Sequence, residues 1–178
     1  MGNIWFISDT HLNHDKDFIW GARGFGSVEE MNEAIITRWN EVVKCDDIVY
    51  HLGDFILGDT ESGLKLIKYL NGSIGLIIGN HDTESRIDAF ENCHNIRLIA
   101  YGDRLKVGKN TLLLSHYPQL TGNFNDRHKV YSIHGHTHSK DAFCEYPLMY
   151  NVNCDAHDCR PVALEDMMQE IRNKVRND

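Results

Sequence analysis

The feature that most constrains the fold of this chain is a series of short apolar runs, each followed at once by a polar cluster. The runs are Asn3–Ser8, Asp47–Leu52, Ile74–Ile78, Thr111–Ser115 and Val130–His134. Runs of this length, rich in Ile, Val, Leu and aromatic residues, are typical of buried strands. The residues directly after each run include His, Asp or Asn. We therefore expect buried strands whose carboxyl ends carry polar side chains.

Helical patterns lie between these runs and after them. We expect helices over Ser27–Val43, Thr60–Leu70, Glu84–Asn92 and Glu165–Val175, and a further short strand at Val162–Leu164. Ser27 and Glu30 form a capping-box signature at the start of the first helix. Alternation of strand and helix in the first half predicts an α/β layered fold. The second half is richer in strands and turns, which predicts an additional antiparallel portion.

Length and composition indicate one globular domain spanning residues 1–178. The 178 residues are 42% hydrophobic and 25% charged, a balance that excludes disordered and coiled-coil proteins. The longest apolar runs are far shorter than the roughly 18 residues that span a bilayer, so we expect no membrane segment. The N-terminal residues show no basic region and no cleavage site, so we expect no signal peptide.

Charge and cysteine content restrict the partners and the compartment. The net charge of −8 makes long nucleic acid an unlikely partner, since such binding is driven by cationic side chains. A small phosphoester or nucleotide remains compatible, because bound metal ions can dominate the charge of their site. Five cysteines, an odd number with no CxxC spacing, predict reduced thiols in the cytoplasm.

The polar clusters supply residue types that bind divalent metal ions. The candidate ligands are Asp9, His11, Asp54, Asn80, His116, His136 and His138. In an extended backbone, residues two apart such as Asp9 and His11 share one face, so both could reach one ion. Asp, His and Asn suit Mn²⁺, Fe²⁺ and Zn²⁺. Seven ligands indicate two ions, the arrangement that clamps in-line displacement at phosphorus.

These motifs, in this order, resemble those of the calcineurin-like metallophosphoesterases, particularly small single-domain bacterial and phage members. The matching motifs are Asp9-x-His11, Gly53-Asp54, Gly79-Asn80-His81-Asp82, His116 and Gly135-His136-x-His138. The resemblance implies a four-layer α/β/β/α sandwich of two mixed sheets flanked by helices. It also implies one ion held by Asp9, His11, Asp54 and His138, and another by Asp54, Asn80, His116 and His136.

The implied activity is hydrolysis of phosphoesters by a hydroxide that bridges the two ions, with His81 as the general acid at the leaving oxygen. Two divalent ions, two carboxylates and one hydroxide sum to a net charge of +1, which attracts a phosphate ester. The resemblance favours Mn²⁺, with Fe, Zn or Ni as alternatives, and it allows a homodimer. Little length remains for a cap domain, so an open cleft and phosphodiester or nucleotide substrates are expected.

Several alternatives stay open. The same residues could serve a phosphomonoesterase, a nuclease, a non-catalytic protein-interaction module on this fold, or a metal-storage protein. Asp82 could orient His81 or cap the helix beginning near Thr83. Some family members place an orienting Asp where this chain has Leu57, and Asp59 is a candidate substitute.

Other residues admit two interpretations each. Asn80 and, in the loop after the first ligand pair, His14 and Arg23 are candidate substrate contacts; for the latter two, the alternative is an ordinary exposed loop. His51 and His134 read as core histidines rather than partners of metal ligands. A zinc site at Cys154, His157 and Cys159 lacks a fourth ligand and has irregular spacing. His94 and His128 are expected to be solvated.

Overall fold

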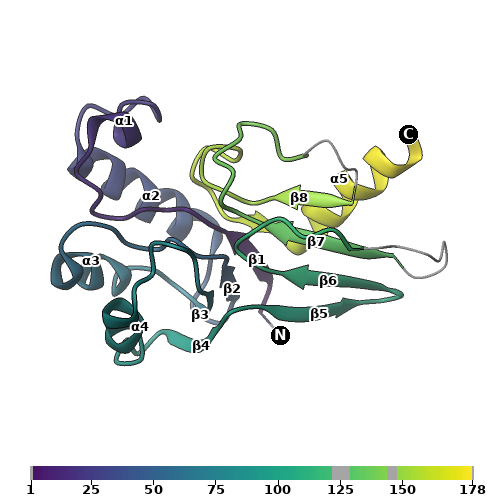
Figure 1. The fold of residues 1–178 in the computed structure, drawn as a ribbon, viewed down its shortest axis with the longest axis horizontal. Helices are drawn as coiled ribbons and strands as arrows, with labels where there is room; N and C mark the ends of the chain where they lie inside the picture. Colours follow the sequence, from purple (N-terminus) through teal and green to yellow (C-terminus); the bar gives the residue numbers. More distant parts are fainter. Residues whose placement is uncertain (1, 122–128, 144–147, 178) are drawn as a thin grey trace.

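The computed structural model describes residues 2–121, 129–143 and 148–177, and these form two mixed sheets (Figure 1). The first sheet has the order β4-β3-β2-β1-β9. Its strands are β1 (Ile4–Ile7), β2 (Ile48–His51), β3 (Ser73–Ile77), β4 (Ile96–Ala100) and β9 (Val162–Ala163). The first four are parallel and β9 is antiparallel to β1. The strands expected in the first half are therefore confirmed, each within a few residues of its predicted bounds.

The second sheet has the order β5-β6-β7-β8. Its strands are β5 (Asp103–Val107), β6 (Asn110–Leu114), β7 (Val130–His134) and β8 (Met149–Asn151). Only β5 and β6 pair in antiparallel fashion, and the other pairs are parallel. In the described residues, the antiparallel portion expected in the second half consists of the β5–β6 hairpin, the pairing of β9 with β1 and the isolated bridge between Phe143 and Tyr150. Parallel pairing here matters because it brings the carboxyl ends of β6 and β7 to the same edge of the sheet.

Helices cover the outer faces of both sheets (Figure 1). They are α1 (Asp17–Trp20), α2 (Val28–Val42), α3 (Thr60–Ile67), α4 (Glu84–Phe90) and α5 (Leu164–Asn177). Helices α2, α3 and α4 lie against the first sheet. Helix α5 contacts β1 and β9 of that sheet and is hydrogen-bonded to β8 of the second sheet through Tyr150 and Glu170. The architecture is the four-layer α/β/β/α sandwich that the motifs implied. Within the described ranges, no helix is both long enough and apolar enough to cross a lipid bilayer.

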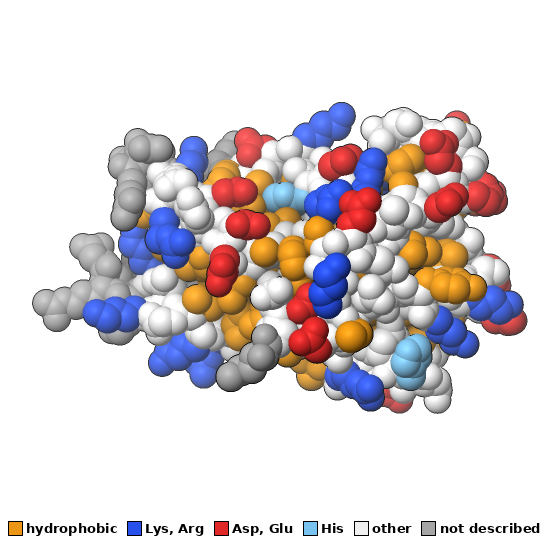
Figure 2. All heavy atoms as spheres, turned by 180° about the vertical axis from the view of Figure 1, so that it is seen from behind, with side chains coloured by type: hydrophobic (Ala, Val, Ile, Leu, Met, Phe, Trp, Pro, Cys, Tyr) orange, Lys and Arg blue, Asp and Glu red, His pale blue; other side chains and the backbone are white. Residues whose placement is uncertain are grey.

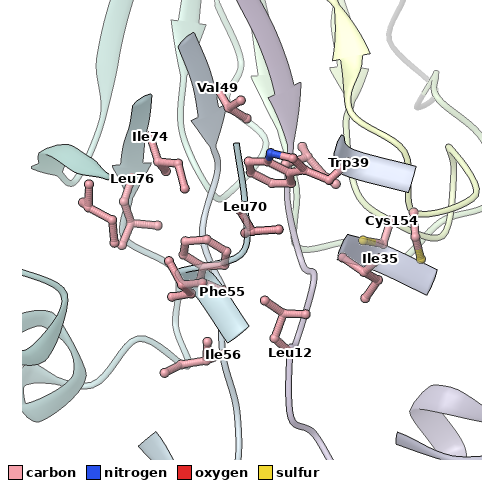
Figure 3. Close-up of a cluster of buried hydrophobic side chains, with 14 of the residues drawn as sticks. Leu12, Ile35, Trp39, Val49, Phe55, Ile56, Leu70, Ile74, Leu76 and Cys154 are labelled. Carbon is pink, nitrogen blue, oxygen red and sulfur yellow. The ribbon is translucent and has the colours of Figure 1, made fainter. Parts of the chain in front are cut away.

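Two buried clusters separate these layers. One joins the first sheet to its helices, with Trp39 and Ile35 of α2 against Val49, Ile74 and neighbouring side chains (Figure 3). The other lies between the two sheets and extends to α5. The first sheet therefore packs apolar side chains on both faces, whereas the second sheet packs them on the face toward the first, which specifies the register of its strands.

Strands β4, β5 and β8 were not expected from the sequence. β4 has exposed positions at Arg97 and Leu98, and β5 alternates exposed and half-buried positions, so neither contains a continuous apolar run. β8 is only three residues long. These strands lack the continuous apolar run that marks a buried strand, because β4 and β5 carry exposed positions and β8 has few residues.

A buried carboxylate fixes the amino-terminal end of the first sheet. Asp47, which precedes β2, accepts hydrogen bonds from the backbone N–H of Asn3 at 2.6 Å, from Trp5 Nε1 at 2.9 Å and from the Lys44 N–H at 2.8 Å. Burial would raise the pKa of Asp47, but these hydrogen bonds outweigh it and hold the pKa below its usual value of 3.8.

We predict that Asp47→Ala lowers the free energy of unfolding by about 2–4 kcal/mol at neutral pH, because three donors lose a charged acceptor. A depressed carboxyl pKa stabilises the fold above the unfolded-state pKa, and this contribution is lost as the pH falls through the folded-state pKa. The difference between wild type and Asp47→Ala should therefore shrink as the pH falls below about 3.8. Urea unfolding at several pH values measures it, with the exposed Asp46→Ala as the control. A difference that does not depend on pH would contradict the assignment.

Candidate metal centre and active site

The polar clusters meet because the turns after neighbouring strands are hydrogen-bonded to one another. Asp9 N–H donates to Gly53 O at 3.0 Å, and His11 N–H donates to Asp54 O at 3.1 Å. In the second sheet, Gly135 N–H donates to His116 O at 3.0 Å. Two bonds at Ser8, to Val152 O and from Cys154 N–H, join the end of β1 to the segment after β8. One edge of the sandwich therefore gathers turns from both sheets.

Most of the predicted ligands adopt a left-handed backbone. The φ angles are 54° at Asp9, 47° at His11, 57° at Asp54, 66° at His136 and 48° at His138. The expectation that Asp9 and His11 share a face of extended backbone is therefore wrong. Asp9 and His11 instead reach the same group of candidate ligand atoms through left-handed backbone conformations. This conformation costs a residue other than glycine roughly 1–2 kcal/mol, and such strain is characteristic of functional sites.

One group of side-chain atoms is formed by Asp9, His11 and His138, whose candidate ligand atoms all lie within 4.8 Å of one another. The Nε2 atoms of His11 and His138 are 3.3 Å apart. His138 Nε2 is also 3.7 Å from Asp9 Oδ1. Imidazole nitrogens and a carboxylate oxygen that converge in this way can share one cation.

A second group is formed by Asp9, Asp54 and His116, again within 4.8 Å. His116 Nε2 lies 3.6 Å from Asp54 Oδ2, 2.9 Å from Asn80 Oδ1 and 3.2 Å from His136 Nδ1. Asp54 Oδ2 is in turn 3.9 Å from His11 Nε2. The seven predicted ligands thus lie together, with Asp54 between the two groups and Asp9 reaching both.

The electrostatics of this cluster fit divalent cations. Burial, followed by the charge of Arg23, holds the pKa of His11 well below its ordinary value. Burial, followed by His116, also lowers the pKa of His136. Neutral imidazole is the form that binds metal. Asp9 is fully buried, its Oδ1 has no hydrogen-bond partner, and burial raises its pKa. A bound cation would relieve the cost of that buried, unpaired oxygen.

His81 stands at the mouth of the cluster. Its backbone N–H donates to Asp54 Oδ1 at 2.8 Å, and its Nε2 lies 3.9 Å from Asp54 Oδ2. Its ring meets the His11 ring edge to face at 5.6 Å. The side chain is 50% exposed, whereas that of Asp54 is only 2% exposed. His81 is therefore held by its backbone next to the central carboxylate while its imidazole faces solvent.

Neither Asp82 nor Asp59 is placed to orient the imidazole of His81. The buried Asp82 carboxylate accepts the backbone N–H groups of Asp54, Phe55 and Gly79 at 2.8, 3.2 and 2.9 Å. It does not cap α4 either, since Thr83 is the N-cap residue. Asp59 caps α3 by accepting from the Ser62 N–H at 2.8 Å. Asp82 thus joins the turns that carry Asp54 and Asn80, a role that neither sequence interpretation included.

Arg23 and His14 differ from each other in position. The Arg23 side chain is only 4% exposed, and its nitrogens bond to Asp155 and to the backbone oxygens of Asp9 and Thr10. Both sequence interpretations of Arg23, a substrate contact and an exposed loop residue, are at odds with this burial. His14 lies beside the cluster, with its ring 5.7 Å from that of His11 and its Nδ1 buried without a partner. His14 remains a candidate for substrate contact.

The remaining histidines and cysteines lie outside the metal cluster. His51 and His134 are fully buried, and burial lowers the pKa of His51 to about 3. His51 Nε2 is 2.9 Å from Thr10 Oγ1, so this core residue also contacts the first ligand turn. Among the described residues, neither three-residue metal group includes Cys154, His157 or Cys159. His94 is exposed, and His128 lies outside the described residues.

Sequence reasoning missed Asp155 and Tyr117. Asp155 Oδ2 lies 2.7 Å from His138 Nδ1. Asp155 follows β8, so recognising that short strand would have identified one more carboxylate beyond a strand end. The exposed Tyr117 follows His116 directly, and its ring is 4.5 Å from the His136 ring.

Glycines allow the turns to approach the two carboxylates closely. A Cβ on Gly79 would lie 2.3 Å from Asp54 Oδ1 and 2.5 Å from the Asp54 nitrogen. A Cβ on Gly135 would lie 2.3 Å from Ser8 Oγ and 2.4 Å from Asp9 Oδ2. Either methyl group would displace a carboxylate at the centre of the cluster.

We predict that Gly79→Ala and Gly135→Ala each weaken Mn²⁺ binding by about tenfold or more, as outer-shell disturbances of metal sites do. Isothermal titration of the metal-free protein measures the effect. Gly26→Ala is the matched control, because its new methyl would meet only the flexible end of Glu30 at 3.0 Å. Equal affinities in all three variants would show that the close approach is not needed to form the site.

Comparisons with known proteins agree with this geometry. The Calcineurin-like phosphoesterase superfamily domain matches residues 3–152. The chain is 35% identical to an uncharacterized protein of Methanocaldococcus jannaschii, over 96% of this chain and 92% of that protein. It is 32% identical to the Gene 66 protein of Mycobacterium phage L5, over 78% of this chain and 79% of that one.

Solved structures share the fold. A protein of unknown function from Aquifex aeolicus superposes with a TM-score of 0.71 and 25% identity, over 96% of this chain and all of that one. An archaeal phosphodiesterase superposes with a TM-score of 0.51 and 20% identity, over 91% of this chain and 99% of that one. With the family domain covering most of its length, the chain belongs to the calcineurin-like phosphoesterase superfamily.

Proposed function

We propose that this chain is a metal-dependent phosphoesterase with two divalent ions, and that it hydrolyses phosphodiesters or nucleotides. The observation that carries the proposal is the position of Asp54. Its Oδ2 lies 3.6 Å from His116 Nε2 and 3.9 Å from the Nε2 atoms of both His11 and His81. A carboxylate between ligands of two groups suits a bridge between two ions, and the nearby His81 suits a proton donor.

The proposed ligand sets are those that the family resemblance implies, and the distances between the candidate ligand atoms are compatible with them. Asp9, His11, Asp54 and His138 would hold one ion, and Asp54, Asn80, His116 and His136 would hold the other. When bound, the two ions would supply the positive charge and the activation of water that displacement at phosphorus requires. Nitrogen and oxygen ligands of this kind suit Mn²⁺, and also Fe, Zn or Ni.

His81 would donate a proton to the leaving oxygen. Its imidazole is half exposed beside a buried carboxylate, so a substrate could approach it from solvent. The hydrogen bond from its backbone N–H to Asp54 Oδ1 holds this residue next to the proposed bridging carboxylate. A positioned general acid accelerates such reactions by roughly 10²–10⁴-fold. Asp82 would act on the backbone of the ligand turns rather than on the imidazole.

Access to the cluster supports small phosphoesters or nucleotides as substrates. Besides His81, the His138 side chain is 38% exposed, so the cluster opens to solvent on one side. His14, with the exposed Phe18 against it, would contact the substrate at this opening, as would Asn80. The face shown in Figure 2 intersperses acidic and basic side chains, and the net charge is −8, so long nucleic acid is a poor substrate.

The cellular compartment that we propose is the cytoplasm. Cys45, Cys93, Cys154 and Cys159 are free thiols in the structure, which suits a reducing environment. Cys144 lies outside the described residues.

We predict that the protein hydrolyses a bis-aryl phosphodiester in the presence of Mn²⁺, and faster than an aryl phosphomonoester. Chelation should abolish turnover, and added Mn²⁺ should restore it. Asp54→Asn should lose activity together with metal binding. His81→Ala should still bind two ions but lose roughly 10²–10⁴-fold in kcat. His94→Ala, which changes an exposed histidine, is the control and should match wild type.

The leaving group distinguishes general-acid catalysis from simple disturbance of the site. The loss in His81→Ala should be larger for an alkyl leaving group than for nitrophenolate, because nitrophenolate departs without needing a proton. Equal losses for both esters would remove His81 as the proton donor. If two ions bind but neither ester is hydrolysed, the result would favour the hypothesis of an interaction module or of a metal-storage protein. Faster monoester hydrolysis would favour a phosphatase, and cleavage of short single strands would favour a nuclease.

A further inference from the structure

A buried ion pair, remote in sequence, supports three of the proposed ligands from behind. Arg23 Nε and Nη2 lie 3.0 and 3.4 Å from the two carboxylate oxygens of Asp155. The two residues are 132 positions apart in the chain. The Arg23 side chain is 4% exposed and that of Asp155 is 16% exposed. A bidentate contact of this kind is geometrically specific, because the planar guanidinium matches the carboxylate.

Asp155 determines how His138 is presented to the metal cluster. Asp155 Oδ2 lies 2.7 Å from His138 Nδ1, and an ionised carboxylate can only accept at this contact. The Nδ1 atom of His138 must therefore carry a hydrogen, which leaves the lone pair of a neutral ring on Nε2. That Nε2 atom is the one that lies 3.3 Å from His11 Nε2 and 3.7 Å from Asp9 Oδ1.

Arg23 also holds the backbone of the first ligand turn. Its Nη2 donates to Asp9 O at 2.6 Å and its Nη1 donates to Thr10 O at 2.9 Å. Asp9 and His11, on either side of Thr10, both have left-handed φ angles. One guanidinium therefore connects the strained turn that carries two ligands to the carboxylate that orients a third.

These contacts support the proposed ligand set of one ion more than that of the other. Asp9, His11 and His138 belong to one proposed ligand set, and all three are held directly or through a neighbour by the ion pair. In the other set, His116 Nδ1 lies 2.8 Å from Leu52 O, so a backbone carbonyl rather than a side chain fixes its orientation. Loss of the ion pair would act on the first set.

We propose that Arg23 and Asp155 form a positioning pair that presets His138 and the Asp9–His11 turn for one of the two ions. The proposal rests on the proposed function for the existence of the metal centre, but it concerns affinity and geometry rather than turnover. Neither residue would touch the substrate. The pair would make one ion-binding site rigid before an ion arrives, which lowers the cost of ordering ligands upon binding.

The test is a titration of the metal-free, full-length protein with Mn²⁺, followed by calorimetry and by electron paramagnetic resonance. Wild type should bind two ions that show spin coupling. Arg23→Lys and Asp155→Asn should each weaken one of the two binding steps by about 10–100-fold and the other much less, since only Asp9 of the three supported residues also lies in the second group of ligand atoms. At intermediate Mn²⁺, the variants should show the spectrum of a single, uncoupled ion. The double variant should lose only slightly more Mn²⁺ affinity than the single variant with the larger loss, because both substitutions break the same contact.

Arg38 and Asp158 provide the matched control. They form an Arg–Asp pair at 2.9 Å near the same loop, and the Asp158 side chain is 83% exposed. Arg38→Lys and Asp158→Asn should leave both binding steps unchanged. A role limited to stability would lower the melting temperature but would not weaken one step selectively in protein that is folded at the titration temperature.

A readout that needs no metal completes the test. In metal-free wild type at alkaline pH, the ¹⁵N shifts of His138 should show a hydrogen on Nδ1, and Asp155→Ala should shift the ring toward the other tautomer. If Asp155→Ala does not fold, the isosteric Asp155→Asn and the conservative Arg23→Lys still report on metal affinity. Two unchanged binding steps in these variants would overturn the positioning pair and leave the proposed function intact. A wild type that binds fewer than two ions would instead overturn the dinuclear centre, and an unchanged His138 tautomer would then overturn the pair as well.

Discussion

The candidate site places imidazoles and carboxylates so close together that a bound cation would stabilise their arrangement. Imidazole nitrogens lie 3.2 and 3.3 Å apart in two pairs, and the Asp9 Oδ1 atom is buried without a hydrogen-bond partner. Left-handed turns at five ligands add backbone strain. Such an arrangement persists only where the surrounding structure over-determines it. The parallel strands provide that rigidity, because apolar packing on both faces of the first sheet and on the inner face of the second holds the turns at their carboxyl ends in place.

Buried carboxylates at both ends of the first sheet complete this support. At the amino-terminal end, Asp47 binds the backbone before β1 and after α2. At the carboxyl-terminal end, Asp82 binds the turns after β2 and β3. Both groups accept from backbone N–H groups that sheet pairing leaves unsatisfied. Because an unpaired buried donor is costly, each carboxylate makes one conformation of its turn strongly preferred.

The clustering of the seven candidate ligands could be predicted from the sequence because its signals are local. An apolar run that ends in Asp, His or Asn locates both a strand and the side chain beyond it, and parallel pairing brings such ends together. The positioning pair gives no local signal: Arg23 lies in a glycine-containing loop that reads as exposed, and its burial depends on Asp155, 132 residues away. Asp82 was misassigned for a related reason, since its partners Asp54 and Phe55 follow a different strand. Edge strands such as β5 were missed because solvent on one face breaks up the apolar run.

The histidines of the site differ in how deeply their side chains are buried, and this difference suits them to different roles. His11 and His116 are almost completely enclosed, so they can bind an ion but cannot exchange protons with a substrate in solution. His81 shares the carboxylate Asp54 with both of them, yet its ring is half exposed and its position is set by its own backbone N–H. An imidazole held in this way can approach a substrate without giving up a ligand. The same turn thus carries Asn80, a proposed metal ligand that contacts His116, and His81, the proposed proton donor, which contacts Asp54.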